Sequence, residues 1–215
     1  MVFRDRHDAG RRLAGQLARY GKERPVILGL PRGGVVVGSE VARALDAPLD
    51  VLIVRKLGVP GAEEVALGAI APGATLVDPE LVARLGISQA AIADIVRRES
   101  EEMSRREHAY RDVRPPVDVA GRTVIVVDDG LATGATAQAA IRSLRLRAPR
   151  RIVFAAPICS RDGAAALRRV ADEVECLECP PAMQAVGWWY EDFSPTTDAE
   201  VVQCLQRAEA PWVFA

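Results

Sequence analysis

The feature that most constrains this chain is the apolar run at 124–127, which is followed at once by two acids and a loop of glycines and threonines. Four consecutive β-branched residues are typical of a strand that is buried on both faces of a parallel sheet. Asp128 and Asp129 stand at its C-terminal end, and residues 137–146 have the pattern of a helix. These residues therefore predict a strand, a short loop and a helix within an α/β protein.

The loop between the acids and the helix suits a phosphate group. Its glycines let backbone N–H groups converge, Thr133 and Thr136 add hydroxyl donors, and the helix end supplies a partial positive charge. Two adjacent acids would repel a bare phosphate, but a ribose 5-phosphate would place its phosphate in the loop and its hydroxyls on the acids. A plain turn of an α/β fold accounts for the strand and the helix, but not for two acids and two threonines in one turn.

These residues resemble the phosphoribosyl-pyrophosphate (PRPP) signature of type I phosphoribosyltransferases, in which four apolar residues precede two acids and a T-G-x-T loop. No lysine follows Gly134, as a Walker A loop requires, and the G-x-G-x-x-G spacing of a dinucleotide fingerprint is absent. The resemblance runs from residue 3 to about 193. It implies an α/β, parallel-sheet type I phosphoribosyltransferase fold, with 1–215 as a single domain and 180–195 contributing to a small irregular hood.

The periodicity of the rest of the chain agrees with such a fold. Strands are expected at 26–30, 49–54, 151–158 and 174–177, and helices at 8–20, 35–45, 79–85, 88–111 and 160–170. A loop is expected at 55–65, followed by a hairpin whose strands are 67–70 and 75–77. A capping box at Thr197 is expected to open a short helix. Strands that alternate with helices imply a parallel sheet covered on both faces. Ligands of such sheets bind at the carboxyl ends of the strands, where 31–34, 55–56, 128–136 and 159–160 would meet.

The resemblance implies a set of PRPP-binding residues at that edge. The residues at 31–34 resemble the pyrophosphate loop of the family, and those at 55–56 precede a stretch that resembles its mobile loop. The implied set is Arg32, Gly33, Gly34, Arg55, Lys56, Asp128, Asp129, Gly130, Leu131, Ala132, Thr133, Gly134, Ala135 and Thr136.

Lys56 is unusual because only two of the 28 basic residues of the chain are lysines. A lysine retained in an arginine-rich chain favours a need for a compact ammonium group rather than a planar fork. Lys56 and Arg32 are therefore the predicted catalytic residues, which would stabilise the departing pyrophosphate. The alternative for Lys56 is a solvated basic turn.

A base-binding role is expected for Val186, Trp188 and Trp189, because Val186-Gly187-Trp188 and Asp192-Phe193 resemble the hood of 6-oxopurine phosphoribosyltransferases. On an extended segment the two tryptophans would point to opposite sides, so that one could stack on a base while the other packs inside. Alternatively, both belong to the core. Ala132 occupies the place of the acid that serves as general base in the 6-oxopurine enzymes, and the resemblance does not select a nucleobase.

The implied reaction transfers the phosphoribosyl group of PRPP to a small nitrogenous base and releases pyrophosphate. Mg²⁺ is the implied cofactor, held through PRPP with Asp128 and Asp129 as the candidate protein ligands. The alternative is a non-catalytic PRPP- or nucleotide-sensing regulator on the same fold. A generic α/β hydrolase or reductase is disfavoured, because G-x-S-x-G and G-x-G-x-x-G are both absent.

Charge and hydropathy limit the expected partners and location. A net charge of −1 predicts no general attraction to nucleic acid, and no apolar run approaches the ~20 residues that span a bilayer. The charged N-terminus lacks the apolar core of a signal peptide, so a cytoplasmic protein is expected. A homodimer is allowed.

The four cysteines, Cys159, Cys176, Cys179 and Cys204, are not expected to form a disulfide framework in a chain of this size. Cys176 and Cys179 form a C-x-x-C pair, but a zinc site would need two further ligands and there is no second pair. Cys176 is instead predicted to be a buried strand residue.

Overall fold

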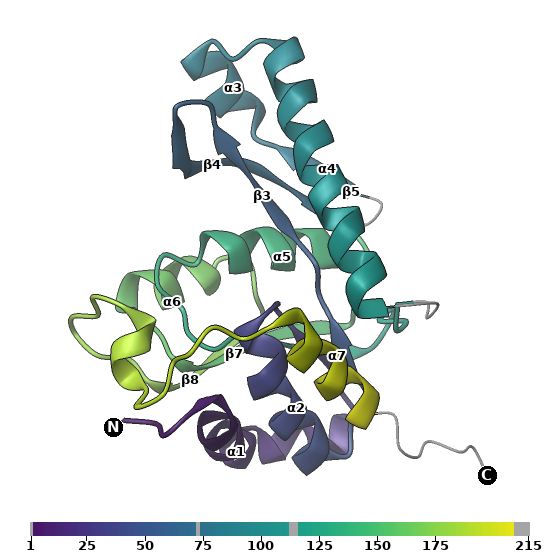
Figure 1. Cartoon of the computed structure of the whole chain (residues 1–215), viewed down its shortest axis with the longest axis vertical. Helices are drawn as coiled ribbons and strands as arrows, with labels where there is room; N and C mark the ends of the chain where they lie inside the picture. Colours follow the sequence, from purple (N-terminus) through teal and green to yellow (C-terminus); the bar gives the residue numbers. More distant parts are fainter. Residues whose placement is uncertain (1, 72–73, 112–115, 209–215) are drawn as a thin grey trace.

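The computed structural model describes residues 2–71, 74–111 and 116–208 (Figure 1). Its centre is a parallel sheet of five strands in the order β2-β1-β6-β7-β8, as predicted. The strands are β1 Val26–Gly29, β2 Leu49–Val51, β6 Thr123–Val127, β7 Arg151–Ile158 and β8 Glu173–Glu178. The fold is therefore α/β, with the predicted signature strand β6 at the centre of the sheet.

Helices cover both faces of this sheet. Below it in Figure 1 lie α1 (Arg6–Leu17), α2 (Gly33–Leu45) and α7 (Asp198–Arg207), and above it lie α5 (Ala135–Arg145) and α6 (Arg161–Leu167). Alternate residues of β6 serve the two faces: Ile125 packs in the cluster of α1, α2 and α7, and Val126 in the cluster of α5 and α6. This two-sided burial explains why β6 is apolar throughout rather than alternating.

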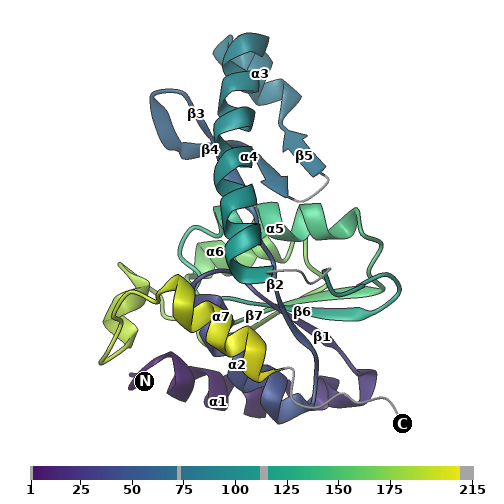
Figure 2. The ribbon, with the colours of Figure 1, turned by 45° about the vertical axis from the view of Figure 1, so that its right-hand side comes forward.

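A second group of elements, here called the cap lobe, stands on the α5 side of the sheet (Figures 1 and 2). It consists of the antiparallel strands β3 (Arg55–Val59), β4 (Ala62–Ala71) and β5 (Ala74–Val77) with the helices α3 (Pro79–Leu85) and α4 (Gln89–Arg111). The small antiparallel sheet forms a hood on the fold. The hairpin predicted at 67–77 is confirmed as β4 and β5.

The loop predicted at 55–65 is wrong, because β3 and the start of β4 occupy it. The glycines and the proline of this stretch suggested a loop. They instead make a bulge at Gly58 and a turn at Gly61, whose φ is 76°. Leu57 and Val59 are buried on either side of the bulge, so that the apolar side of β3 joins the core.

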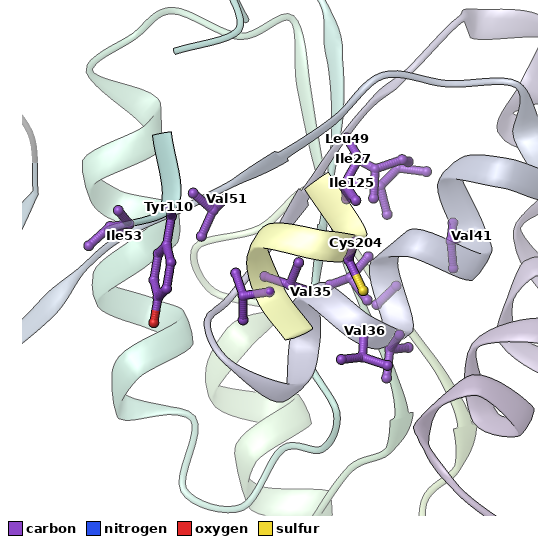
Figure 3. Close-up of a cluster of buried hydrophobic side chains, with 14 of the residues drawn as sticks. Ile27, Val35, Val36, Val41, Leu49, Val51, Ile53, Tyr110, Ile125 and Cys204 are labelled. Atoms are coloured by element: carbon purple, nitrogen blue, oxygen red, sulfur yellow. The ribbon is translucent and has the colours of Figure 1, made fainter. Parts of the chain in front are cut away.

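The core of the cap lobe is continuous with that of the parallel sheet. Figure 3 shows Tyr110 of α4 and Cys204 of α7 in one apolar cluster with Ile27 and Ile125 of the sheet. The hydroxyl group of Tyr110 also donates to Asp198 Oδ1 at 2.5 Å. The long helix α4 therefore connects the cap lobe to the C-terminal helix α7 (Figure 2).

The segment after β8 is irregular, as predicted, and contains a short 3₁₀ helix η2 (Val186–Trp189). The tryptophans are thus not on an extended strand. Phe3 and Tyr190 form an isolated parallel bridge, and Phe3, Ala9 and Tyr190 make a small buried cluster. The capping box at Thr197, predicted from the sequence, opens α7.

Two of the cysteines form a disulfide bond, which the sequence did not predict, and Cys176 is a strand residue as predicted but only partly buried. Cys159, just after β7, is bonded to Cys176 of β8, with their Cα atoms 6.1 Å apart. The pairing follows from the register of two neighbouring parallel strands, which the spacing of the cysteines along the chain does not reveal. Cys179 is exposed and Cys204 is buried, and both are free.

Replacing Ile125 by alanine tests the core on the face of the sheet that α1, α2 and α7 cover. Ile125 is fully buried at the centre of the sheet, so its truncation should lower the free energy of unfolding by about 2–5 kcal/mol. The matched control is Leu146→Ala, whose side chain is 63% exposed and which should change stability by no more than about 0.5 kcal/mol. Urea denaturation of the two variants measures both values, and equal losses would contradict the assignment of the core.

Candidate active site

The signature loop connects β6 to α5 at the carboxyl edge of the parallel sheet. Gly134 is the N-cap residue of α5, with a positive φ of 77° that a residue with a side chain rarely adopts. The first turn of a helix leaves N–H groups without intrahelical partners, and Gly134 has no side chain to bond them. The loop therefore presents backbone donors, the Thr136 hydroxyl and the positive end of a helix dipole to any anion placed there.

Two of the predicted ligand-binding residues fix the loop in place. Leu131 is buried; its N–H donates to the carbonyl of Ile158 at 2.8 Å and its carbonyl accepts from the N–H of Ser160 at 2.7 Å. The hydroxyl of Ser160 donates to the carbonyl of Ala132 and accepts from the N–H of Gly163. The end of β7 and the start of α6 therefore hold the loop on one side, and its opposite side faces the pyrophosphate loop.

The predicted pyrophosphate loop at 31–34 packs directly on the two acids. A Cβ atom on Gly33 would lie 1.9 Å from Asp129 Oδ2, and one on Gly34 would lie 2.5 Å from the carbonyl oxygen of Val127. Only glycine allows this approach. The Pro31–Arg32 peptide bond is cis, and α2 begins at Gly33, two residues earlier than predicted.

The two acids have different surroundings. Asp129 Oδ2 accepts from Arg6 Nε at 2.7 Å, and both side chains are largely buried. The N-terminus of α2 also lies beside Asp129, where a helix dipole favours negative charge. Desolvation by the surrounding protein and the charge of Asp129 together raise the pKa of Asp128 well above its ordinary value, although the Asp129 N–H, which donates to Asp128 Oδ1, opposes this.

Arg6 is a site residue that the sequence did not indicate. Its Nη1 donates to the carbonyl of Ser194 at 2.8 Å, and its guanidinium group lies 4.0 Å from the ring centroid of Phe193. Tyr190 adds a second link between the same segments, because its hydroxyl donates to the carbonyl of Asp129 at 2.6 Å. The start of α1, the signature acid and the segment after η2 are therefore joined by one arginine. Its partners lie more than a hundred residues away, so no local pattern marks it.

A cationic cavity of about 410 Å³ lies where the cap lobe meets the signature loop. It brings together three predicted site residues, Arg55, Lys56 and Thr136. The other lining residues are Pro31, Val54, Gly58, Arg98, Glu99 and Arg106. Arg55 is paired with Glu99 at 2.7 Å. The side chains of Glu63 and Glu64, farther along β4, lie outside those that the structure describes.

Two predicted residues lie elsewhere. Arg32, expected to act with Lys56, is about half exposed and lies 4.0 Å from Asp198 at the start of α7, and it does not line this cavity. Ala135 lines a second cavity of about 730 Å³ between β4, β5 and α5.

The three predicted base-binding residues differ in exposure. Val186 packs on Gly130, because a Cβ atom built on Gly130 would lie 2.2 Å from Val186 Cγ1. Trp189 packs against the cluster of Phe3 and Tyr190, whereas Trp188 is 69% exposed. Of the two tryptophans, Trp188 therefore has the ring free to stack on a ligand.

The donor set of the site is compatible with Mg²⁺ that is held mainly by a substrate. Within the described residues, no group of three or more His, Cys, Asp or Glu side chains could hold a metal ion. Mg²⁺ usually keeps several waters and substrate phosphates as ligands and needs only one or two carboxylates. Asp128 and Asp129 could supply these.

Comparison with known proteins identifies clear relatives. A family model described as the phosphoribosyl transferase domain matches residues 4–194. The chain is 45% identical over its whole length to the "Putative phosphoribosyl transferase Rv0571c" of Mycobacterium tuberculosis (strain H37Rv), and equally to MT0597 of strain CDC 1551. The chain spans 48% of the length of each of these relatives.

The fold has a close counterpart among solved structures. The crystal structure of TT1426 from Thermus thermophilus is similar with a TM-score of 0.88 and 43% sequence identity, over 96% of this chain and 99% of that one.

Among the helices that the structure describes, none is long and apolar enough to cross a bilayer.

The raised pKa of Asp128 predicts a pH-dependent effect of Asp128→Asn. A carboxyl whose pKa is higher in the folded than in the unfolded protein favours folding when protonated, and this contribution is lost as pH rises from its ordinary pKa of 3.8 through its raised pKa in the folded protein. In the absence of Mg²⁺ and ligand, the variant should therefore gain stability relative to the wild type above about pH 4, by up to about 1.4 kcal/mol per pH unit. The side-chain oxygen of the asparagine can still accept the hydrogen bond from the Asp129 N–H.

Urea denaturation between pH 4 and pH 8 measures this difference. Asp94→Asn is the control, because the Asp94 side chain is 75% exposed on α4 and should give a curve parallel to that of the wild type. A stability difference for Asp128→Asn that stays constant with pH would refute the raised pKa.

Proposed function

The chain belongs to the phosphoribosyltransferase family, and on this premise we propose that it is a Mg²⁺-dependent enzyme that transfers the phosphoribosyl group of PRPP to a nitrogenous base and releases pyrophosphate. The observation that carries the proposal is the position of Thr136. It belongs to the signature loop at the start of α5 and also lines the cavity that holds Arg55 and Lys56. One ligand with phosphates at both ends of a ribose could therefore occupy loop and cavity together.

Each part of the site has a role in this proposal. The backbone amides of 131–135, with the hydroxyls of Thr133 and Thr136, would bind the 5-phosphate. Asp128 and Asp129 would orient the ribose hydroxyls, and Arg6 would hold Asp129 in position for them. Arg55 and Lys56 would neutralise the pyrophosphate, and Gly33 and Gly34 would let it approach the backbone.

The proposed reaction breaks the bond between C1 of the ribose and the pyrophosphate oxygen. The electron pair leaves with pyrophosphate, and a ring nitrogen of the acceptor forms the new bond to C1 and loses a proton. The transition state resembles an oxocarbenium ion, as in glycoside cleavage. When bound, Mg²⁺ would offset the charge of the phosphate oxygens. The protein would contribute by positioning the reactants and stabilising the leaving group.

The acceptor would bind beside the segment at 180–195. Trp188 offers an exposed ring, and Arg6 places Phe193 close to the signature acids. We propose this segment as the part of the hood that covers the base, while the cap lobe covers the pyrophosphate. Ala132 supplies no carboxylate, so the acceptor nitrogen would have to lose its proton to another group. A homodimer stays a prediction.

The contact of Val186 with Gly130 favours a second candidate function. It leaves no gap for a planar base between these two residues, and together with Ala132 it fits a protein that binds PRPP or a nucleotide as a signal without catalysis. Calorimetric titration of the full chain with PRPP and Mg²⁺, followed by a screen of nitrogenous bases for pyrophosphate release, separates the two. Binding without release for every base would support the sensor, and absence of PRPP binding would overturn the enzyme and the PRPP sensor alike.

Lys56→Ala should separate binding from catalysis. The charge on pyrophosphate grows as its bond to C1 breaks, so Lys56 should act more on the transition state than on bound PRPP. Turnover should fall by about 10²–10³-fold, with a smaller change in the affinity for PRPP. Lys22→Ala is the matched control, because Lys22 is the other lysine of the chain and is exposed. This variant should leave the turnover and the affinity for PRPP unchanged. Full activity of Lys56→Ala would show that this lysine is only a solvated surface group.

A further inference from the structure

Helix α4 contributes two arginines to the cationic cavity that the signature residues alone do not predict. Arg98 and Arg106 line it together with Lys56 and Thr136. They are eight residues apart, which corresponds to about 12 Å along a helix. The cap lobe therefore supplies positive charge along two turns of α4, facing a loop that belongs to the parallel sheet.

The charge balance of the cavity favours a polyanion. Among the described side chains that line the cavity, four are cationic and one, Glu99, is anionic. Glu99 is mostly buried and is shared between Arg55 at 2.7 Å and Arg98 at 3.4 Å. Glu102 on the same helix offsets part of the charge of Arg106, but the described cations still outnumber the two acids, which favours an anionic ligand. Two linked phosphates are longer than one and could contact both Lys56 on β3 and the arginines on α4.

The side chain of Arg106 is held in place by its hydrogen bonding and its burial. Its Nε donates to Glu102 Oε1 at 2.8 Å, and only a quarter of the side chain is exposed. Arg105 shares the same acid, and hydrogen bonds from both arginines lower the pKa of Glu102 to about 2. Glu102 therefore stays ionised and holds the Nε of Arg106, which also lines the cavity.

We propose that Arg98 and Arg106 are pyrophosphate-binding residues, so that the two linked phosphates of the ligand connect the cap lobe to the parallel-sheet body. The inference rests on the proposed function of the same site and adds a part of the protein to it. The pyrophosphoryl group would lie between Lys56 on β3 and the two arginines on α4. The phosphate at the other end of the ligand would lie on the backbone amides of 131–135, which do not line this cavity among the described residues.

Titration of the full chain with inorganic pyrophosphate and Mg²⁺ tests this assignment. Arg98→Gln should weaken pyrophosphate binding by about 3- to 10-fold, and Arg106→Gln by about tenfold or more, because each removes a charged hydrogen-bond donor. Arg97→Gln is the matched control. Arg97 lies on the same helix with 66% of its side chain exposed, against 64% for Arg98, but does not line the cavity, and its variant should bind within about twofold of the wild type.

Ribose 5-phosphate serves as the second probe, because it lacks the pyrophosphoryl group. Its affinity should be the same in all the variants. Arg106→Lys keeps the charge and should recover part of the pyrophosphate affinity, which separates anion binding from a general defect in α4. Thermal melting confirms that each variant is folded.

The inference is overturned if Arg98→Gln and Arg106→Gln bind pyrophosphate as tightly as Arg97→Gln does. It is also overturned if the affinity for ribose 5-phosphate falls as much as that for pyrophosphate, or if the wild type does not bind pyrophosphate. Failure of the proposed function gives a different pattern. A wild type that binds pyrophosphate with the expected losses in the variants, but binds neither PRPP nor ribose 5-phosphate, would uphold the inference and overturn the proposed function.

Discussion

The candidate site depends on one close contact between two backbones. The first turn of α2 lies against the end of β6, near enough that a Cβ atom on Gly34 would collide with the carbonyl of Val127. This contact puts the positive end of a helix beside Asp129 and packs Gly34 against Asp128. The unequal surroundings of the two acids, the place of Arg6 and the position of the pyrophosphate loop all follow from it.

The parts that the sequence predicted are those in which local pattern and tertiary structure agree. The apolar run before Asp128 is typical of a strand buried on both faces, and the glycines and threonines after it indicate a turn at a helix end. Alternation of strands and helices then placed 31–34 and 128–136 on one edge of the sheet, where the structure has them. The ligand-binding and catalytic roles of these residues stay predictions.

The parts that the sequence did not predict depend on contacts between distant segments. The apolar side of β3 was masked by Gly58, which forms a bulge instead of a loop. Arg6, and the arginines of α4, look like ordinary surface charges until the fold places them at the site. The disulfide between Cys159 and Cys176 likewise depends on the register of β7 and β8, which becomes known only once the strands are paired.

The position of α7 has a consequence for the order in which the protein forms during synthesis. Val201 and Leu205 of this helix complete the core cluster of α2, and Asp198 at its start lies beside both Arg32 and Tyr110. A ribosome delivers α7 after every other described helix, so in a nascent chain the part of α2 that α7 covers stays exposed until then. Chaperone capture would therefore concentrate on chains whose parallel sheet has already emerged but whose α7 has not.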